Sequence, residues 1–83
     1  MANESLRSLI SRAKAGDQSA LNEVVQRFRP LIRKYVRQAP HKDAHDLEQE
    51  LTLRLITLVR SYREELPYGF KDLVEKELRK TNS

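Results

Sequence analysis

The chain has 83 residues, of which 34% are charged and 39% hydrophobic, the balance of one small water-soluble domain. It contains no cysteine, which excludes disulfides and thiolate zinc sites. No apolar run approaches the roughly 18 residues of a membrane span, and no signal peptide opens the chain. We therefore expect a single helical domain over residues 4–80, a frayed tail at 81–83, a cytoplasmic location and no membrane partner. The net charge of +4 permits contact with nucleic acid without requiring it.

The first two expected helices are separated by a Gly-Asp pair. Apolar residues at helical spacing predict a helix over about residues 4–15, after which Gly16 can stop the helix and Asp17 can cap the next one. The second helix is predicted over about residues 18–38. Its apolar stripe continues across Pro30, which favours one kinked helix over two separate helices.

The second half of the chain predicts two more helices. Asp43 is a good N-cap for a third helix, which continues to about residue 62. On a helical wheel the core face of this helix consists of Ala44, Leu47, Leu51, Leu55, Leu58 and Tyr62. A last helix is expected over about residues 68–80, with Phe70, Leu73, Val74 and Leu78 turned inward. The prediction is therefore an all-α fold, a compact bundle of three long helices plus a shorter C-terminal helix.

The third helix also carries apolar residues away from its core face. Leu53 and Ile56 fall on the opposite side of the wheel, among Asp46, Gln49 and Arg60, with Glu50 flanking them. Such residues can be scattered surface side chains, or another helix can cover them. Alternatively, an apolar pair ringed by polar side chains is typical of a small docking site for a partner protein. The wheel does not choose between these interpretations.

A cationic segment, RFRPLIRKYVR, occupies the second half of the second helix. Its basic residues are Arg27, Arg29, Arg33, Lys34 and Arg37, the candidates for contact with nucleic acid. The alternative is a solvated face whose aliphatic stems cover apolar neighbours.

The sequence offers little for catalysis. His41 and His45 lie four residues apart, but the sequence supplies no obvious third ligand. No glycine-rich phosphate loop is present, and the serines have no base arranged around them. We predict no metal, no cofactor and no enzymatic activity.

Two blocks, GDQSALNEVVQRFRPLIRKYVR and DAHDLEQELTLRLITLVRSY, resemble region 2, the core-binding region, of bacterial sigma factors. The matching positions are Gly16, Asp17, Ala20, Leu21, Phe28, Pro30 and Leu31 in the first block, and Asp43, Asp46, Leu47, Gln49, Glu50 and Leu55 in the second. In that family the D-L-x-Q-E helix docks on the clamp helices, a coiled coil of the largest RNA polymerase subunit. The resemblance implies polymerase contacts at Asp46, Gln49, Glu50, Leu53 and Ile56, and Arg60 lies on the same face.

The chain also departs from complete sigma factors. It has no tryptophan to trap unstacked bases, and Asp72, Glu75 and Glu77 in the last helix would repel phosphates. It also lacks the C-terminal promoter-recognition domain of that family, so we expect a co-sigma type of accessory protein. Such a protein docks on RNA polymerase while a partner sigma-like protein supplies promoter recognition, and promoter DNA is approached through the complex. Two alternatives stay open, a small helix-turn-helix DNA-binding regulator and an anti-sigma-like decoy that competes for the polymerase clamp.

Overall fold

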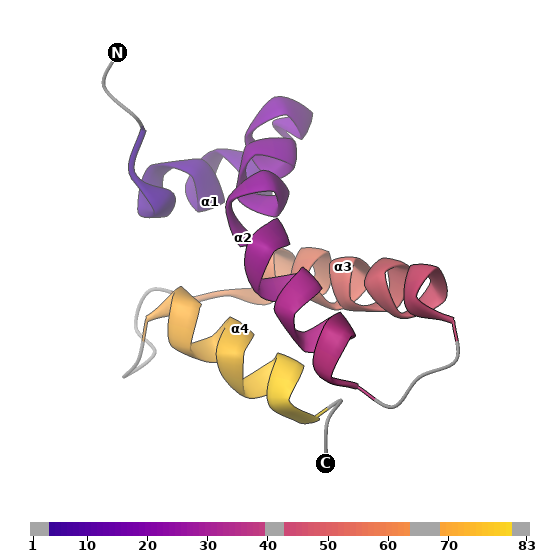
Figure 1. The fold of residues 1–83 in the computed structure, drawn as a ribbon. Helices are drawn as coiled ribbons and strands as arrows, with labels where there is room; N and C mark the ends of the chain where they lie inside the picture. Colours follow the sequence, from indigo (N-terminus) through magenta and orange to yellow (C-terminus); the bar gives the residue numbers. More distant parts are fainter. Residues whose placement is uncertain (1–3, 40–42, 64–68, 81–83) are drawn as a thin grey trace.

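The computed structural model describes residues 4–39, 43–63 and 69–80, and within these ranges it contains four α-helices and no strand. The helices are α1 (Leu6–Lys14), α2 (Gln18–Gln38), α3 (Ala44–Ser61) and α4 (Phe70–Arg79). Figure 1 shows α2 crossing α3, with α1 near one end of α2 and α4 beside the other. The all-α bundle predicted from the sequence is confirmed, although α1 has 9 residues and is as short as α4, which has 10. The tail at 81–83 lies outside the described residues.

The corner between α1 and α2 has the predicted signals. Gly16 has φ +102, and its amide donates to the carbonyl of Ala13 while the amide of Asp17 donates to that of Arg12. This pair of bonds is the Schellman stop of a helix, and the left-handed φ explains the glycine. The carboxylate of Asp17 then accepts a hydrogen bond from the amide of Ala20 at 3.1 Å, which confirms the predicted cap of α2.

The residues at the N-caps of α3, α1 and α4 define where these three helices begin. Asp43 caps α3 as predicted, because its carboxylate accepts from the amide of Asp46 at 3.1 Å. The first helix begins at Leu6 rather than at residue 4, because Ser5 is its N-cap and accepts from the amide of Ser8 at 3.2 Å. Gly69 stands at the N-cap of α4 without a side-chain hydrogen bond, and the expected start at residue 68 lies outside the described residues.

The α2 helix runs unbroken through Pro30, as the continuous apolar stripe predicts. Proline supplies no amide for the carbonyl of Gln26, one turn earlier. Both residues are exposed, so water can reach this side of the helix. The single long α2 therefore passes from α1 at one end to α4 at the other.

The core differs from the prediction in α3. Its buried residues are Leu47, Leu51, Leu55 and Val59, each no more than 1% exposed. Steps of four residues rotate the buried line around the helix by about 40° per step, which suits a helix that its neighbours cross at an angle (Figure 1). The line therefore ends on Val59, a residue absent from the predicted core face. Of the predicted residues, Leu58 and Tyr62 are half-buried and Ala44 is exposed.

The C-terminal helix is fixed by aromatic contacts. Phe70 is buried, and its ring lies edge-on against Phe28 of α2, with centroids 5.6 Å apart, and against Tyr62, with centroids 5.3 Å apart. Val74 and Leu78 continue the buried face of α4, whereas Leu73, predicted to point inward, is half-buried. Edge-to-face aromatic pairs stabilise a core beyond the area that they bury.

Candidate functional site

The exposed side of α3, called here the α3 face, consists of Asp46, Gln49, Glu50, Leu53, Ile56 and Arg60. Leu53 is 64% exposed. Among the described residues it is the one large hydrophobic residue classed as exposed. Gln49 and Glu50 precede it by about one helical turn and are exposed as well. An apolar side chain within a polar ring has the composition of a small protein-binding surface.

Ile56 differs from Leu53. It is half-buried and packs against the core. The predicted apolar pair on the α3 face is therefore unequal. Leu53 is its exposed centre, and Ile56 forms its border with the protein interior.

The α3 face is continuous with α2. A shallow cavity of about 360 Å³ is lined by Leu53, Gln49, Glu48 and Thr52 of α3 and by Arg29 of α2. One turn further along α2, Arg33 Nε lies 3.8 Å from Glu48 Oε1. Arg29 and Arg33, grouped from the sequence with candidates for nucleic-acid contact, thus stand beside the α3 face. Helical periodicity contains no signal for this placement, because it does not tell which helices are neighbours.

On its other side the α3 face is connected to α4. Arg54 lies 3.6 Å from Glu50 one turn earlier and 3.9 Å from Glu77 of α4. These are loose, solvent-screened pairs that contribute little to stability. They do place a cation beside Glu50.

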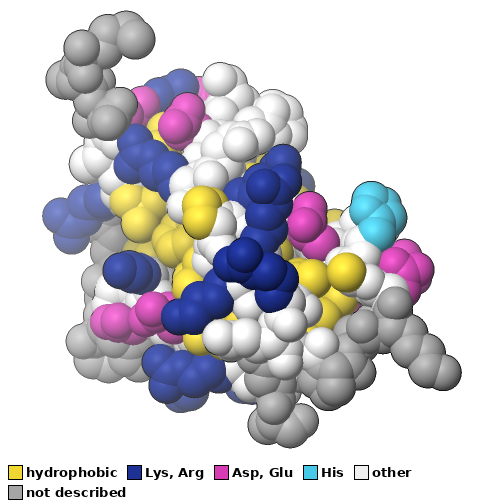
Figure 2. Space-filling view, in the orientation of Figure 1, with side chains coloured by type: hydrophobic (Ala, Val, Ile, Leu, Met, Phe, Trp, Pro, Cys, Tyr) yellow, Lys and Arg dark blue, Asp and Glu magenta, His cyan; other side chains and the backbone are white. Residues whose placement is uncertain are grey.

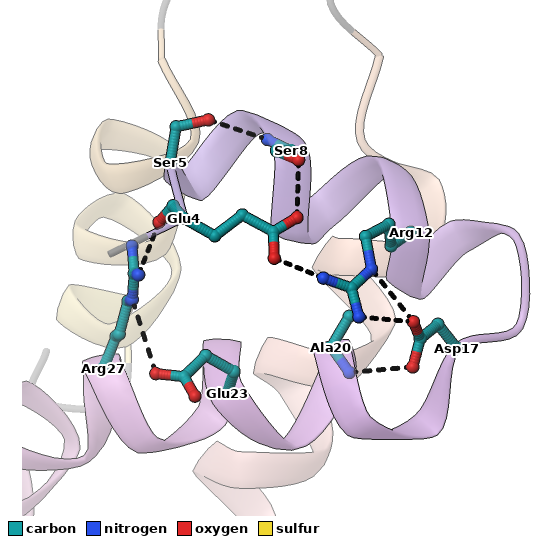
Figure 3. A network of polar contacts seen from close by, with 8 residues as sticks. All are labelled: Glu4, Ser5, Ser8, Arg12, Asp17, Ala20, Glu23 and Arg27. Atoms are coloured by element: carbon teal, nitrogen blue, oxygen red, sulfur yellow. Dashed lines mark hydrogen bonds and ion pairs between the residues drawn. The ribbon is translucent and has the colours of Figure 1, made fainter. Parts of the chain in front are cut away.

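The remaining basic residues of α2 face elsewhere. Arg27 donates to the backbone carbonyl of Glu4 at 2.5 Å and lies 3.8 Å from Glu23, the two contacts drawn for it in Figure 3. Lys34 and Arg37 are exposed and have no ion pair within the described residues. In Figure 2 lysine and arginine side chains run over α2 down the middle of the molecule. The five cations thus meet different neighbours, and acidic side chains pair with Arg27 and Arg33.

A polar network surrounds the corner between α1 and α2 (Figure 3). Arg12 forms two hydrogen bonds to Asp17, at 2.9 and 2.7 Å, and also binds the carboxylate of Glu4. The hydrogen bond from Arg12, and next that from the Ala20 amide, hold the pKa of Asp17 below its ordinary value of 3.8. At the start of α3 the Asp46 amide likewise lowers the pKa of Asp43. Both caps are therefore ionised near neutral pH.

The structure offers no metal centre within the described ranges, where no group of three or more His, Cys, Asp or Glu side chains is placed to hold an ion. His45 lies on the exposed start of α3 with its ring Nε2 3.4 Å from the side-chain Nε2 of Gln49, and His41 falls outside those ranges. None of the helices in this part of the chain is long and apolar enough to cross a membrane.

Comparison with known proteins shows which family the sequence of this chain matches. Residues 7–63, which include the α3 face and the cationic part of α2, match the family described as helix-turn-helix domain. The chain is 34% identical over 70 residues to the ECF RNA polymerase sigma factor SigD of Mycobacterium tuberculosis and to the protein of the same name in Mycobacterium bovis. That match covers 77% of this chain and 33% of each relative, so the chain spans about a third of the length of the curated relatives it matches. No solved structure gives a significant match. Because the family match extends over more than half of its residues, the chain belongs to the helix-turn-helix domain family.

Proposed function

We propose that this protein is a transcription accessory factor of the co-sigma type. It docks through the α3 face on the clamp helices, the coiled coil of the largest RNA polymerase subunit, and a partner sigma-like protein supplies promoter recognition. The similarity to ECF RNA polymerase sigma factors supports the choice of polymerase as the partner. The observation that carries the proposal is the 64% exposure of Leu53 within a polar ring.

The chemistry of the α3 face suits a coiled-coil partner. Leu53 would provide the apolar centre that loses water on binding, and such central residues carry most of the energy of an interface. Asp46 and Glu50 would pair with basic side chains of the coiled coil, while Gln49 both donates and accepts hydrogen bonds. Arg29, across the cavity from Leu53, adds a cation that can hold a carboxylate in a bidentate manner.

A binding measurement with the isolated clamp-helix coiled coil tests this proposal. We expect Leu53→Ala and Gln49→Ala each to weaken binding about tenfold or more, a loss of roughly 1.4 kcal/mol. Gln26→Ala is the matched control, because Gln26 is also an exposed glutamine in a helix but lies on α2 outside the α3 face. If both α3 variants bound as tightly as the control, the docking surface would be wrong.

The second candidate is a small DNA-binding regulator, favoured by the family match and by Lys34 and Arg37, which have no ion pair in the described part of the chain. A salt titration of binding to random duplex DNA separates it from the first. A steep decrease of affinity with salt, from an affinity of about a micromolar, would favour the regulator. We give it second place because acidic side chains already pair with Arg27 and Arg33.

Polymerase docking has two opposite consequences. A co-sigma factor raises transcription from promoters of its partner, whereas an anti-sigma-like decoy occupies the clamp and lowers transcription by a competing sigma factor. In vitro transcription with a fixed amount of sigma protein and increasing amounts of this chain distinguishes them by the sign of the effect.

A further inference from the structure

A second cavity lies on the side of α2 away from α3. Both α1 and α4 pack against α2, but within the described residues these two helices do not contact each other. Between them is an open groove of about 520 Å³, called here the α1–α4 groove. Its position separates it from the α3 face, with which it shares no lining residue.

The floor of the α1–α4 groove is apolar and accessible. It includes Leu6 of α1 and Leu31 of α2, which are both half-buried, and Pro30, which is exposed. Figure 2 shows hydrophobic side chains in this region between α1 and α4, with lysine and arginine side chains around them. Apolar atoms left open in a concave surface favour an occupant that has apolar side chains of its own.

The rim of the groove is cationic. Lys34 of α2 and Lys71 of α4 line it, and neither has an ion pair or a hydrogen bond within the described residues. Arg27 also lines it, held by the Glu4 carbonyl and Glu23. Glu75 is the acidic lining residue. With more cations than acids, the rim attracts an occupant with negative charge.

The chemistry of the groove favours an acidic protein segment over a nucleic acid. Phe28 lines the groove but is 6% exposed, and its ring meets Phe70 edge-on inside the core, so it offers no open face on which a base could stack. The aliphatic floor formed by Leu6, Pro30 and Leu31 suits leucine-like side chains instead. A second copy of the same chain is disfavoured because each copy carries a net charge of +4.

We infer that the α1–α4 groove binds an amphipathic helix of a second protein, with leucine-like residues toward the floor and acidic residues toward Lys34 and Lys71. This is the helix-in-groove mode of recognition. The inference rests on the proposed function, which requires a partner protein and uses the α3 face for polymerase. It assigns the attachment of that partner to the opposite side of α2.

A designed peptide tests the binding chemistry directly. The probe is a helical peptide with leucines on one face and glutamates on both flanks, accompanied by a second peptide in which every glutamate is lysine. Amide chemical shifts of the full chain locate the binding site, and fluorescence anisotropy gives the affinity. We expect the acidic peptide to shift the amides of Leu31, Lys34 and Lys71, and the basic peptide to leave them unchanged.

Charge reversal supplies the variant and its control. We expect Lys34→Glu/Lys71→Glu to weaken binding of the acidic peptide at least about tenfold. Arg37→Glu/Lys76→Glu changes the net charge equally at exposed positions that do not line the groove and should bind the peptide as the wild type does. Thermal unfolding of all three proteins establishes that they are equally folded. The inference is overturned if both double variants lose the same affinity for the acidic peptide. It is also overturned if the acidic peptide does not bind the wild type.

Three further measurements separate the alternatives. A single-stranded DNA oligonucleotide that bound the groove in place of the peptide would overturn the inference in favour of nucleic acid, and concentration-dependent dimerisation lost in Lys34→Glu/Lys71→Glu would overturn it in favour of a second copy. The same double variant should bind the clamp-helix coiled coil as tightly as the wild type. If the wild type bound the peptide but not the coiled coil, the proposed function would fail while the groove assignment stood.

Discussion

Phe70, the first residue of α4, lies edge-on against Phe28 in the middle of α2, with ring centroids 5.6 Å apart. Phe70 also meets Tyr62, just after α3, so a single ring connects three helices. The contact helps to hold α4 against α2, beside the α1–α4 groove that Phe28 also lines. Stability of the fold and geometry of the proposed partner site therefore depend on the same aromatic pair.

The first prediction concerns this pair. Phe70→Ala removes a side chain that is 4% exposed, and we expect it to lower the free energy of unfolding by about 3–5 kcal/mol. Phe70→Leu keeps most of the buried volume but loses both edge-to-face ring contacts, so it should cost about 1–3 kcal/mol, less than the alanine variant. Chemical denaturation of the three proteins measures both values. An alanine variant as stable as the wild type would mean that α4 does not pack as described.

The second prediction contrasts two leucines of α3, two residues apart. Leu51 is fully buried, so Leu51→Ala should lower the free energy of unfolding by about 2–5 kcal/mol. Leu53→Ala should change it by no more than about 0.5 kcal/mol, because 64% of Leu53 is already exposed. Thermal unfolding of the two variants, monitored by circular dichroism, checks both predicted changes in stability. A destabilised Leu53→Ala would indicate that this residue serves the fold, and its loss of polymerase binding could then not be assigned to the α3 face.

The third prediction concerns acid pH. The pKa of Asp17 is lowered chiefly by the hydrogen bond from Arg12, and that of Asp43 by the hydrogen bond from the Asp46 amide. A carboxyl whose pKa is lower in the folded state stabilises the fold at pH values above its ordinary pKa of 3.8. That contribution is lost as the pH falls from 3.8 through the lowered pKa.

Denaturation measured from about pH 5 down to about pH 2 checks this sign. Asp43→Asn keeps a neutral cap of similar shape, and we expect the variant to lose less stability over that range than the wild type. Equal pH dependence in the two proteins would show that the Asp43 carboxylate contributes nothing through its charge.

The fourth prediction uses the two glycines as a matched pair. Gly16 has φ +102, a conformation that an alanine adopts only with strain, so Gly16→Ala should destabilise the fold by about 1–2 kcal/mol. Gly69 has φ −73, and an added Cβ would meet no atom within 4 Å. Gly69→Ala should therefore cost no more than about 0.5 kcal/mol, because the lower entropy of the unfolded chain offsets the poorer N-cap that alanine makes. Destabilisation of the same size in both variants would rule out backbone conformation as the cause.

Local signals in the sequence predicted the helix ends well. The Gly16 stop and the Asp17 and Asp43 caps are confirmed, because each depends on residues within one turn of the chain. The continuation of α2 through Pro30 is also confirmed, because the apolar stripe continues in register on both sides of the proline. The Ser5 cap was missed, although a serine just before an apolar periodic segment is a recognised signal.

Properties that depend on neighbouring helices were predicted less well. A helical wheel gives the direction of each side chain about one axis, but the crossing of other helices decides which directions are covered. Val59 was therefore missed as a core residue, and the wheel did not distinguish the exposed Leu53 from the half-buried Ile56. For the same reason the sequence did not indicate that Arg29 shares a cavity with Leu53, or that Lys34 and Lys71 line a common groove.

Glu4 is held by cations from two different helices, since its carboxylate binds Arg12 of α1 and its carbonyl accepts from Arg27 of α2. The same Arg12 holds Asp17, the cap of α2. The first turns of α1 and α2 are consequently mechanically coupled, and neither can fray without releasing charged groups that the other needs. Opening of this corner should be a single cooperative event, so the capped amides of Ser8 and Ala20 should show similar protection from exchange with solvent.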